Sequence, residues 1–116
     1  MKLTQKDFEL FKSECQKWLT KFGMNDWKVY YSFDRLNGNF AECRYDYRDC
    51  VATISLNKEI SKFSFQHSDV INSAKHEVIH LLLARFHGMA KERFINQDEI
   101  DNEWERLVRI IEKALK

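Results

Sequence analysis

Residues 70–86 read VINSAKHEVIHLLLARF, and this stretch decides the fold. The spacing of its apolar residues predicts a helix that begins after Ser68 and Asp69, two possible caps, and ends at Gly88. The second half of the stretch is apolar nearly all round, which is typical of a central, buried helix rather than a surface helix. We therefore expect this helix to lie at the centre of the domain.

Helices are also predicted on either side of this stretch. Thr4 followed by Asp7 is a cap signal for a first helix that Gly23 ends. Asn96 and Glu99 resemble a capping box at the start of a last helix, which runs to about residue 115. Apolar residues spaced by three and four predict the inward faces of these helices, which are Phe8, Phe11, Cys15, Trp18 and Phe22 in the first and Ile100, Trp104, Leu107 and Ile111 in the last.

Three short segments between the first and second helices alternate apolar and polar residues, as half-buried strands do: 27–33, 40–45 and 50–56. Asn37-Gly38 is a strong hairpin signal between the first two strands. For the last two strands we expect the cross-strand pairs Tyr45–Cys50, Cys43–Ala52 and Ala41–Ile54. The element order predicts an α+β fold with an N-terminal helix, a three-stranded, mainly antiparallel sheet, a central helix and a C-terminal helix.

The composition narrows the class of protein. The chain has 116 residues, of which 19 are Lys or Arg and 18 are Asp or Glu, so the formal net charge is +1. We expect residues 1–116 to form one domain, and near neutrality disfavours a mainly electrostatic binder of nucleic acid or membranes. No signal-like or membrane-spanning apolar run is present, so we expect a cytoplasmic protein. Three cysteines without C-x-x-C spacing, Cys15, Cys43 and Cys50, argue against a disulfide or structural zinc framework.

The sequence from His76 to His80 is H-E-x-x-H, and it lies inside the predicted central helix. A spacing of four places both imidazoles on one helix face about one turn apart, where both can bind one zinc ion. Glu77 lies about 100° round the helix, so it is placed to accept a proton from the zinc-bound water rather than to bind the metal. Polar groups in an apolar helix are also costly without a compensating cation. We predict a zinc site with His76 and His80 as ligands and Glu77 as general base.

A catalytic zinc ion needs a third protein ligand. In a continuous helix His87 lies about 10 Å along the axis beyond His80, which is too far. In the last helix Glu103 lies about 70° from the middle of the apolar stripe, whereas Glu105 lies about 130° away. A capping role already explains Glu99. We therefore predict Glu103 as the third ligand, with Glu99 and Glu105 as alternatives.

This motif, the strand before it and the acidic helix after it resemble a minimal zincin metallopeptidase core. More closely, residues 27–115 are similar to the short zinc metallopeptidases encoded by phages and prophages, near the gluzincin and SprT-like domains. The metzincin pattern is not met, because it needs glycine and histidine where this chain has Leu83 and Phe86. The resemblance implies a polypeptide substrate, a third ligand from an acidic residue of the last helix, and a substrate-binding edge on the strand at residues 51–56.

We therefore expect a zinc-dependent hydrolase of peptide bonds, whose oligomeric state the sequence leaves open. Five side chains could stabilise the oxyanion of the tetrahedral intermediate, and the sequence does not choose among Tyr30, Tyr31, Tyr45, Tyr47 and His87. One alternative is an inactive zincin-like binding module or a phage accessory protein. A nucleic-acid accessory role is disfavoured because the basic residues Lys28, Arg35, Arg44 and Arg48 alternate with the acidic residues Asp34, Glu42, Asp46 and Asp49.

Overall fold

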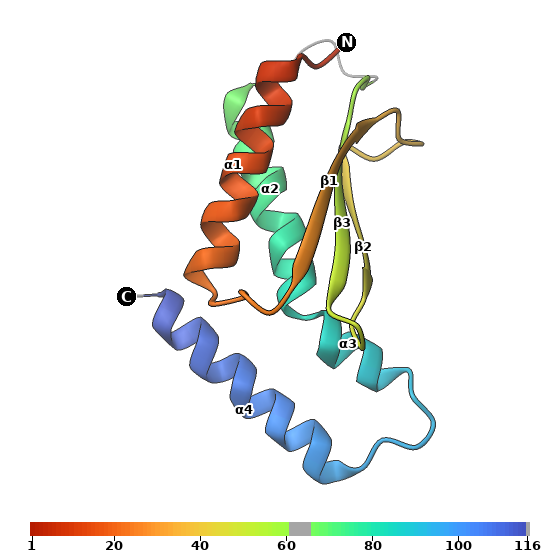
Figure 1. Ribbon diagram of the computed structural model, residues 1–116, viewed down its shortest axis with the longest axis vertical. Coiled ribbons are helices and arrows are strands. Elements are labelled where there is room, and N and C mark those ends of the chain that lie inside the picture. Colours follow the sequence, from red (N-terminus) through yellow and green to blue (C-terminus); the bar gives the residue numbers. More distant parts are fainter. Residues whose placement is uncertain (61–65, 116) are drawn as a thin grey trace.

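The computed structural model describes residues 1–60 and 66–115 and confirms an α+β fold (Figure 1). Its elements, in chain order, are α1 (Gln5–Lys21), β1 (Lys28–Asp34), β2 (Ala41–Asp46), β3 (Val51–Asn57), α2 (His67–Leu82), α3 (Ala84–Ala90) and α4 (Gln97–Ala114). Helices α1 and α2 pack side by side against one face of the sheet, and α4 crosses below them. In the part of the chain that is described, no helix is long and apolar enough to cross a membrane.

The sheet is mixed rather than mainly antiparallel, which corrects one part of the predicted fold. Its strand order is β1-β3-β2, with β3 parallel to β1 and antiparallel to β2. The burial of each strand explains this order. Five of the seven residues of β3 are buried, whereas β1 and β2 consist of exposed and half-buried residues. A strand buried on both faces belongs at the centre of a sheet.

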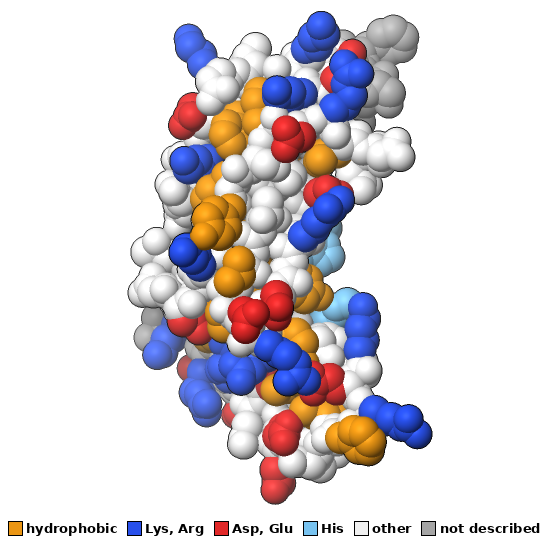
Figure 2. Space-filling model, turned by 45° about the vertical axis from the view of Figure 1, so that its right-hand side comes forward, with side chains coloured by type: hydrophobic (Ala, Val, Ile, Leu, Met, Phe, Trp, Pro, Cys, Tyr) orange, Lys and Arg blue, Asp and Glu red, His pale blue; other side chains and the backbone are white. Residues whose placement is uncertain are grey.

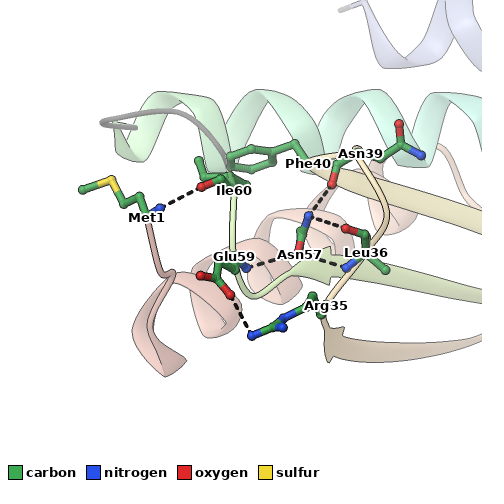
Figure 3. Close-up of a pocket in the computed structure, with 9 residues that line it drawn as sticks. Met1, Arg35, Leu36, Asn39, Phe40, Asn57, Glu59 and Ile60 are labelled. Atoms are coloured by element: carbon green, nitrogen blue, oxygen red, sulfur yellow. Dashed lines mark hydrogen bonds and ion pairs between the residues drawn. The ribbon is translucent and has the colours of Figure 1, made fainter.

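The predicted hairpin at Asn37-Gly38 is wrong, because β1 and β2 lie on opposite sides of β3. The loop between them is held instead by Asn57 at the end of β3 (Figure 3). Its side-chain oxygen accepts hydrogen bonds from the backbone N–H groups of Leu36 and Glu59, and its side-chain nitrogen donates to the carbonyl oxygens of Leu36 and Asn39. These four bonds fix the loop across the end of the central strand.

The predicted hairpin between β2 and β3 is present, but its register differs by two residues. Its pairs include Tyr45–Ala52, Cys43–Ile54 and Ala41–Leu56. A shift of two preserves the face of every side chain, so the small and apolar residues still share the inner face. Cys50 lies in the turn with a φ of 56° rather than in the strand. All three cysteines are free, as expected.

The predicted helix ends are largely confirmed. Thr4 caps α1 in a reciprocal capping box with Asp7, and Gly23 follows the helix at a φ of 68°. The side chain of Asn96 accepts a hydrogen bond from the Glu99 backbone and donates one to the Glu99 carboxylate, so it caps α4. Local side-chain chemistry therefore sets these boundaries.

The predicted single helix over residues 70–86 is instead two helices that join at Leu83. Helix α2 begins at His67, where the Asp69 carboxylate accepts a hydrogen bond from the backbone N–H of Gln66. The chain changes direction at Leu83, and α3 passes beneath the end of β2 (Figure 1). The stretch is also not buried all round, since Ile79 in α2 and Leu83 at the junction are more than a third exposed. The sequence misled us because apolar residues here face both the core and a cleft.

Gly88, the predicted helix end, lies inside α3, where it allows close packing. A Cβ atom on this residue would overlap the ring of Tyr47. The Tyr47 hydroxyl and the Arg48 guanidinium both donate hydrogen bonds to Glu92, so the ring cannot move without disturbing these contacts. Glycine at position 88 therefore lets the β2–β3 turn rest on α3.

Gly88→Ala should lower the free energy of unfolding by about 1–3 kcal/mol, because overpacking outweighs the better helix propensity of alanine. Thermal and urea denaturation would measure this change. In a Tyr47→Ala background the overlap is gone, so the same substitution should become stabilising by about 0.5–1 kcal/mol. Destabilisation of equal size in both backgrounds would contradict the packing explanation.

The rotation of α4 differs from the predicted one. Leu107 is buried as predicted, but Trp104 is 59% exposed and Ile111 is 39% exposed. The buried residues of this helix are Glu103, Leu107 and Ala114. The apolar residues of α4 form two overlapping stripes, and the sequence alone does not show which stripe is buried. The structure buries the side of the helix that includes Glu103.

Candidate metal centre

His76 and His80 lie one turn apart on the exposed face of α2, as the motif predicts. Their Nε2 atoms are 3.0 Å apart, and the two rings are inclined at 80° with centroids 4.7 Å apart. The nitrogens therefore converge on one point in front of the helix. Because both rings are exposed, they need no cation to offset a cost of burial, which corrects that part of our sequence argument.

The separation of the two nitrogens suits a shared metal ion. With Zn–N bonds of about 2.0–2.1 Å, two ligands of an ideal tetrahedral site lie about 3.3–3.4 Å apart. The observed distance is a few tenths of an ångström shorter. A small rotation of either imidazole removes this difference, so the pair fits two of the ligand positions of a zinc ion.

Glu77 lies beside the two histidines but points into a less solvated environment. The residue is only 7% exposed. Burial raises the pKa of Glu77, an effect that the nearby His76 and His80 oppose. Cys43 lines the same cleft, and its pKa is raised to about 12 by burial and by the charge of Glu77. A partly desolvated carboxylate of this kind is a stronger proton acceptor than one in water.

These residues line a cleft of about 690 Å³ between α2, α3 and β2. Figure 2 shows histidine side chains at a hollow in this side of the surface. Strand β2 contributes Glu42, Cys43 and Tyr45, and the two helices contribute His87, Phe86 and Leu83. The cleft therefore combines the predicted metal-binding pair, the predicted general base and an apolar wall.

Two of the five candidate oxyanion donors lie at this cleft. Tyr45 and His87 line it, and the Tyr45 hydroxyl is 2.5 Å from Nδ1 of His87. Burial, followed by the nearby Cys43, raises the pKa of Tyr45, so its hydroxyl keeps its proton. Tyr30, Tyr31 and Tyr47 are not among the residues that line the cleft.

The bend at Leu83 brings His87 to the cleft, a position that a continuous helix does not predict. A continuous helix places His87 about 10 Å beyond His80 along the axis. In the structure α3 turns beneath β2 and returns His87 to the cleft that His76 and His80 line. Neither proline nor glycine lies at the bend, so the sequence holds no local signal for it.

Glu103, the predicted third ligand, is not brought to the histidine pair in this structure. It is buried at 4% exposure, and Arg106 binds both of its carboxylate oxygens at 2.6 and 2.7 Å. It lines a different cleft, together with Arg85 and the alternative ligand Glu99. Glu105 is exposed on α4. Among the described residues, no group of three His, Cys, Asp or Glu side chains is arranged to hold a metal ion.

A second cleft of about 670 Å³ is lined by the loop that Asn57 holds (Figure 3). Its polar groups bind one another: Arg35 forms an ion pair with Glu59 at 2.8 Å, and the amino group of Met1 donates to the carbonyl oxygen of Ile60. Asn39 lines both clefts. The contacts in this second cleft therefore help to hold the loop whose residue Asn39 also lines the histidine cleft.

Comparison of the chain with protein-family models, with curated proteins and with solved structures gives no match.

Proposed function

We propose that this chain is a zinc-dependent peptidase whose centre is the cleft between α2, α3 and β2. The observation that carries the proposal is the convergence of the Nε2 atoms of His76 and His80, 3.0 Å apart, beside the buried carboxylate of Glu77. A zinc ion held by the two imidazoles would lower the pKa of a water molecule and polarise a carbonyl group. A minimal zincin domain, as the sequence resemblance implies, is part of the same proposal.

Glu77 would move the proton in this reaction. Its carboxylate accepts a proton from the attacking water, whose oxygen forms a bond to the carbonyl carbon. It then gives that proton to the amine nitrogen as the C–N bond breaks. With its proton on Nδ1, His87 would donate a hydrogen bond to the Tyr45 hydroxyl oxygen. The Tyr45 O–H would then be free to donate a hydrogen bond to the carbonyl oxygen as negative charge develops there.

The substrate-binding edge has to be revised. By resemblance we assigned it to residues 51–56, but β3 is the central strand and pairs on both sides. This assignment is wrong, because such a strand has no free edge. Among the residues that the structure describes, strand β2 pairs only with β3, and it lines the histidine cleft. We propose that an extended polypeptide adds to β2 as a further strand through main-chain hydrogen bonds.

The proposal is tested by incubating the zinc-loaded protein with unfolded casein and sequencing the new amino termini by mass spectrometry. We expect cleavage that stops when a chelator removes the metal and returns when zinc is added. Casein that stays intact at full zinc occupancy would contradict the peptidase and favour a binding module.

Glu103 remains our predicted third ligand, and it would have to exchange its contact with Arg106 for the metal. Glu103→Gln should then weaken zinc binding by at least about tenfold, whereas Arg106→Ala should leave binding unchanged or tighter because it frees the carboxylate. Zinc titration of both variants measures this, with Glu99→Ala and Glu105→Ala as tests of the alternatives. A Glu103→Gln protein that unfolds more easily but binds zinc like the parent would show that Glu103 serves only the ion pair.

A further inference from the structure

Helix α4 carries an apolar stripe on its outer side. The stripe consists of Trp104, Val108, Ile111 and Leu115, which are 59%, 45%, 39% and 80% exposed. Their four-three-four spacing places them in one line along the helix, as in the seam of a coiled coil. Large apolar side chains that gather in one exposed patch are typical of an interaction site.

The stripe is not part of the domain core. The inward side of α4 is formed by other residues, of which Glu103, Leu107 and Ala114 are buried. In Figure 1 the helix runs below the sheet and the two long helices rather than between them. The radius of gyration is 15.4 Å, compared with about 13 Å for a compact domain of this length. Helix α4 therefore extends the molecule and presents its outer side at the margin.

On the side of the stripe that faces away from the domain, the charged residues of α4 nearest the stripe are acidic. At about 100° per residue, Asp101, Glu105 and Glu112 lie roughly 50–90° from the middle of the stripe, all on the same side. All three are exposed. The basic residues Arg109 and Lys113 lie further away, at roughly 130° and 170°. The other flank is the inward side of the helix, so the charged residues of α4 that lie beside the stripe are acidic.

We propose that the stripe is a docking site for an amphipathic helix of another protein, whose apolar face is flanked by lysine or arginine. The apolar line would pack against the partner's own line, and the acidic row would select its charge. A second copy of this chain fits less well. An antiparallel pair of α4 helices sets the two acidic rows against each other, and a parallel pair sets the acidic row against the body of the other copy. The proposal does not depend on the zinc centre.

Two synthetic helical peptides provide the test. Both carry leucine at the seam positions, and the flanking positions are lysine in one and glutamate in the other. By fluorescence anisotropy of the labelled peptides, we expect the lysine peptide to bind at least about tenfold more tightly than the glutamate peptide. Trp104→Ala should weaken binding of the lysine peptide by more than about tenfold. Phe94→Ala is the matched control, because this aromatic side chain is 89% exposed but lies outside the stripe.

Charge reversal makes the test specific. The double variant Glu105→Lys with Glu112→Lys should prefer the glutamate peptide. A control with the same change in net charge, Glu9→Lys with Asp34→Lys, alters exposed residues of α1 and β1 and should keep the preference of the parent. Equal binding of both peptides, or equal losses in the Trp104 and Phe94 variants, would overturn the proposal. A dimer of the parent that Trp104→Ala dissociates in sedimentation experiments would overturn it in favour of self-association.

Discussion

Replacement of His76 or His80 by alanine should abolish stoichiometric zinc binding, whereas the unchanged chain should hold about one zinc ion. The reason is that the Nε2 atoms of the two rings converge to 3.0 Å, so in the proposed centre each would supply one of the few bonds that hold the metal. Loss of an outer-shell partner alone costs about 10–100-fold in affinity, so loss of a direct ligand should cost more. Metal analysis of the purified variants and calorimetric titration with zinc would measure the effect.

His67 offers a matched control for this experiment. It is a histidine of the same helix, exposed like the other two, but it does not line the cleft. His67→Ala should therefore bind zinc like the parent. The metal centre would be refuted if His76→Ala and His80→Ala also kept one zinc ion per chain.

Glu77→Gln should keep the zinc ion but lower the turnover of peptide hydrolysis by about 10²–10⁴-fold, the usual contribution of a general base. The amide of glutamine cannot accept the proton that the carboxylate accepts. Because burial raises the pKa of Glu77, the charged carboxylate is disfavoured by its surroundings, and the neutral amide should not lower the melting temperature. Turnover, zinc content and thermal unfolding should be measured on the same preparation.

Glu42→Gln is the control for that variant, because this glutamate lines the same cleft from β2. Its turnover should fall far less than that of Glu77→Gln, because Glu42 is not the proton acceptor and its charge acts only by raising the pKa of Glu77. If Glu77→Gln hydrolyses peptides as fast as the parent, Glu77 is not the proton acceptor. If the parent binds zinc without hydrolysing peptides, the alternative of a zincin-like binding module gains support.

Local chemistry made several parts of the fold predictable. The capping pairs at Thr4 and Asn96 and the glycine at position 23 mark helix ends, because these side chains satisfy or relieve the backbone at one place in the chain. The strands were predictable as well, because the alternation of apolar and polar residues is a local property of the sequence. The histidine pair was also predictable, since a spacing of four residues in one helix fixes its own geometry.

Features that depend on distant contacts could not be predicted in this way. The place of β3 between β1 and β2 depends on burial that only the assembled sheet reveals. The bend at Leu83 places His87 at the cleft, but no residue at the bend signals it. The rotation of α4 was misjudged because its apolar residues form two overlapping stripes. The third zinc ligand remains a prediction because it depends on that rotation.

The central position of β3 also constrains how the chain can fold. Strands β2 and β3 are joined by a short turn, so they can pair early through local contacts. Strand β1 comes first in the sequence, but Lys28 at its start pairs with Val51, which lies 23 residues later (51 − 28). Closing this loop costs conformational entropy before any pairing between β1 and β3 is gained. We therefore expect β1 to dock after the hairpin has formed. During synthesis, β1 has to wait for its partner until β3 leaves the ribosome, and α1 has to wait until α2 follows.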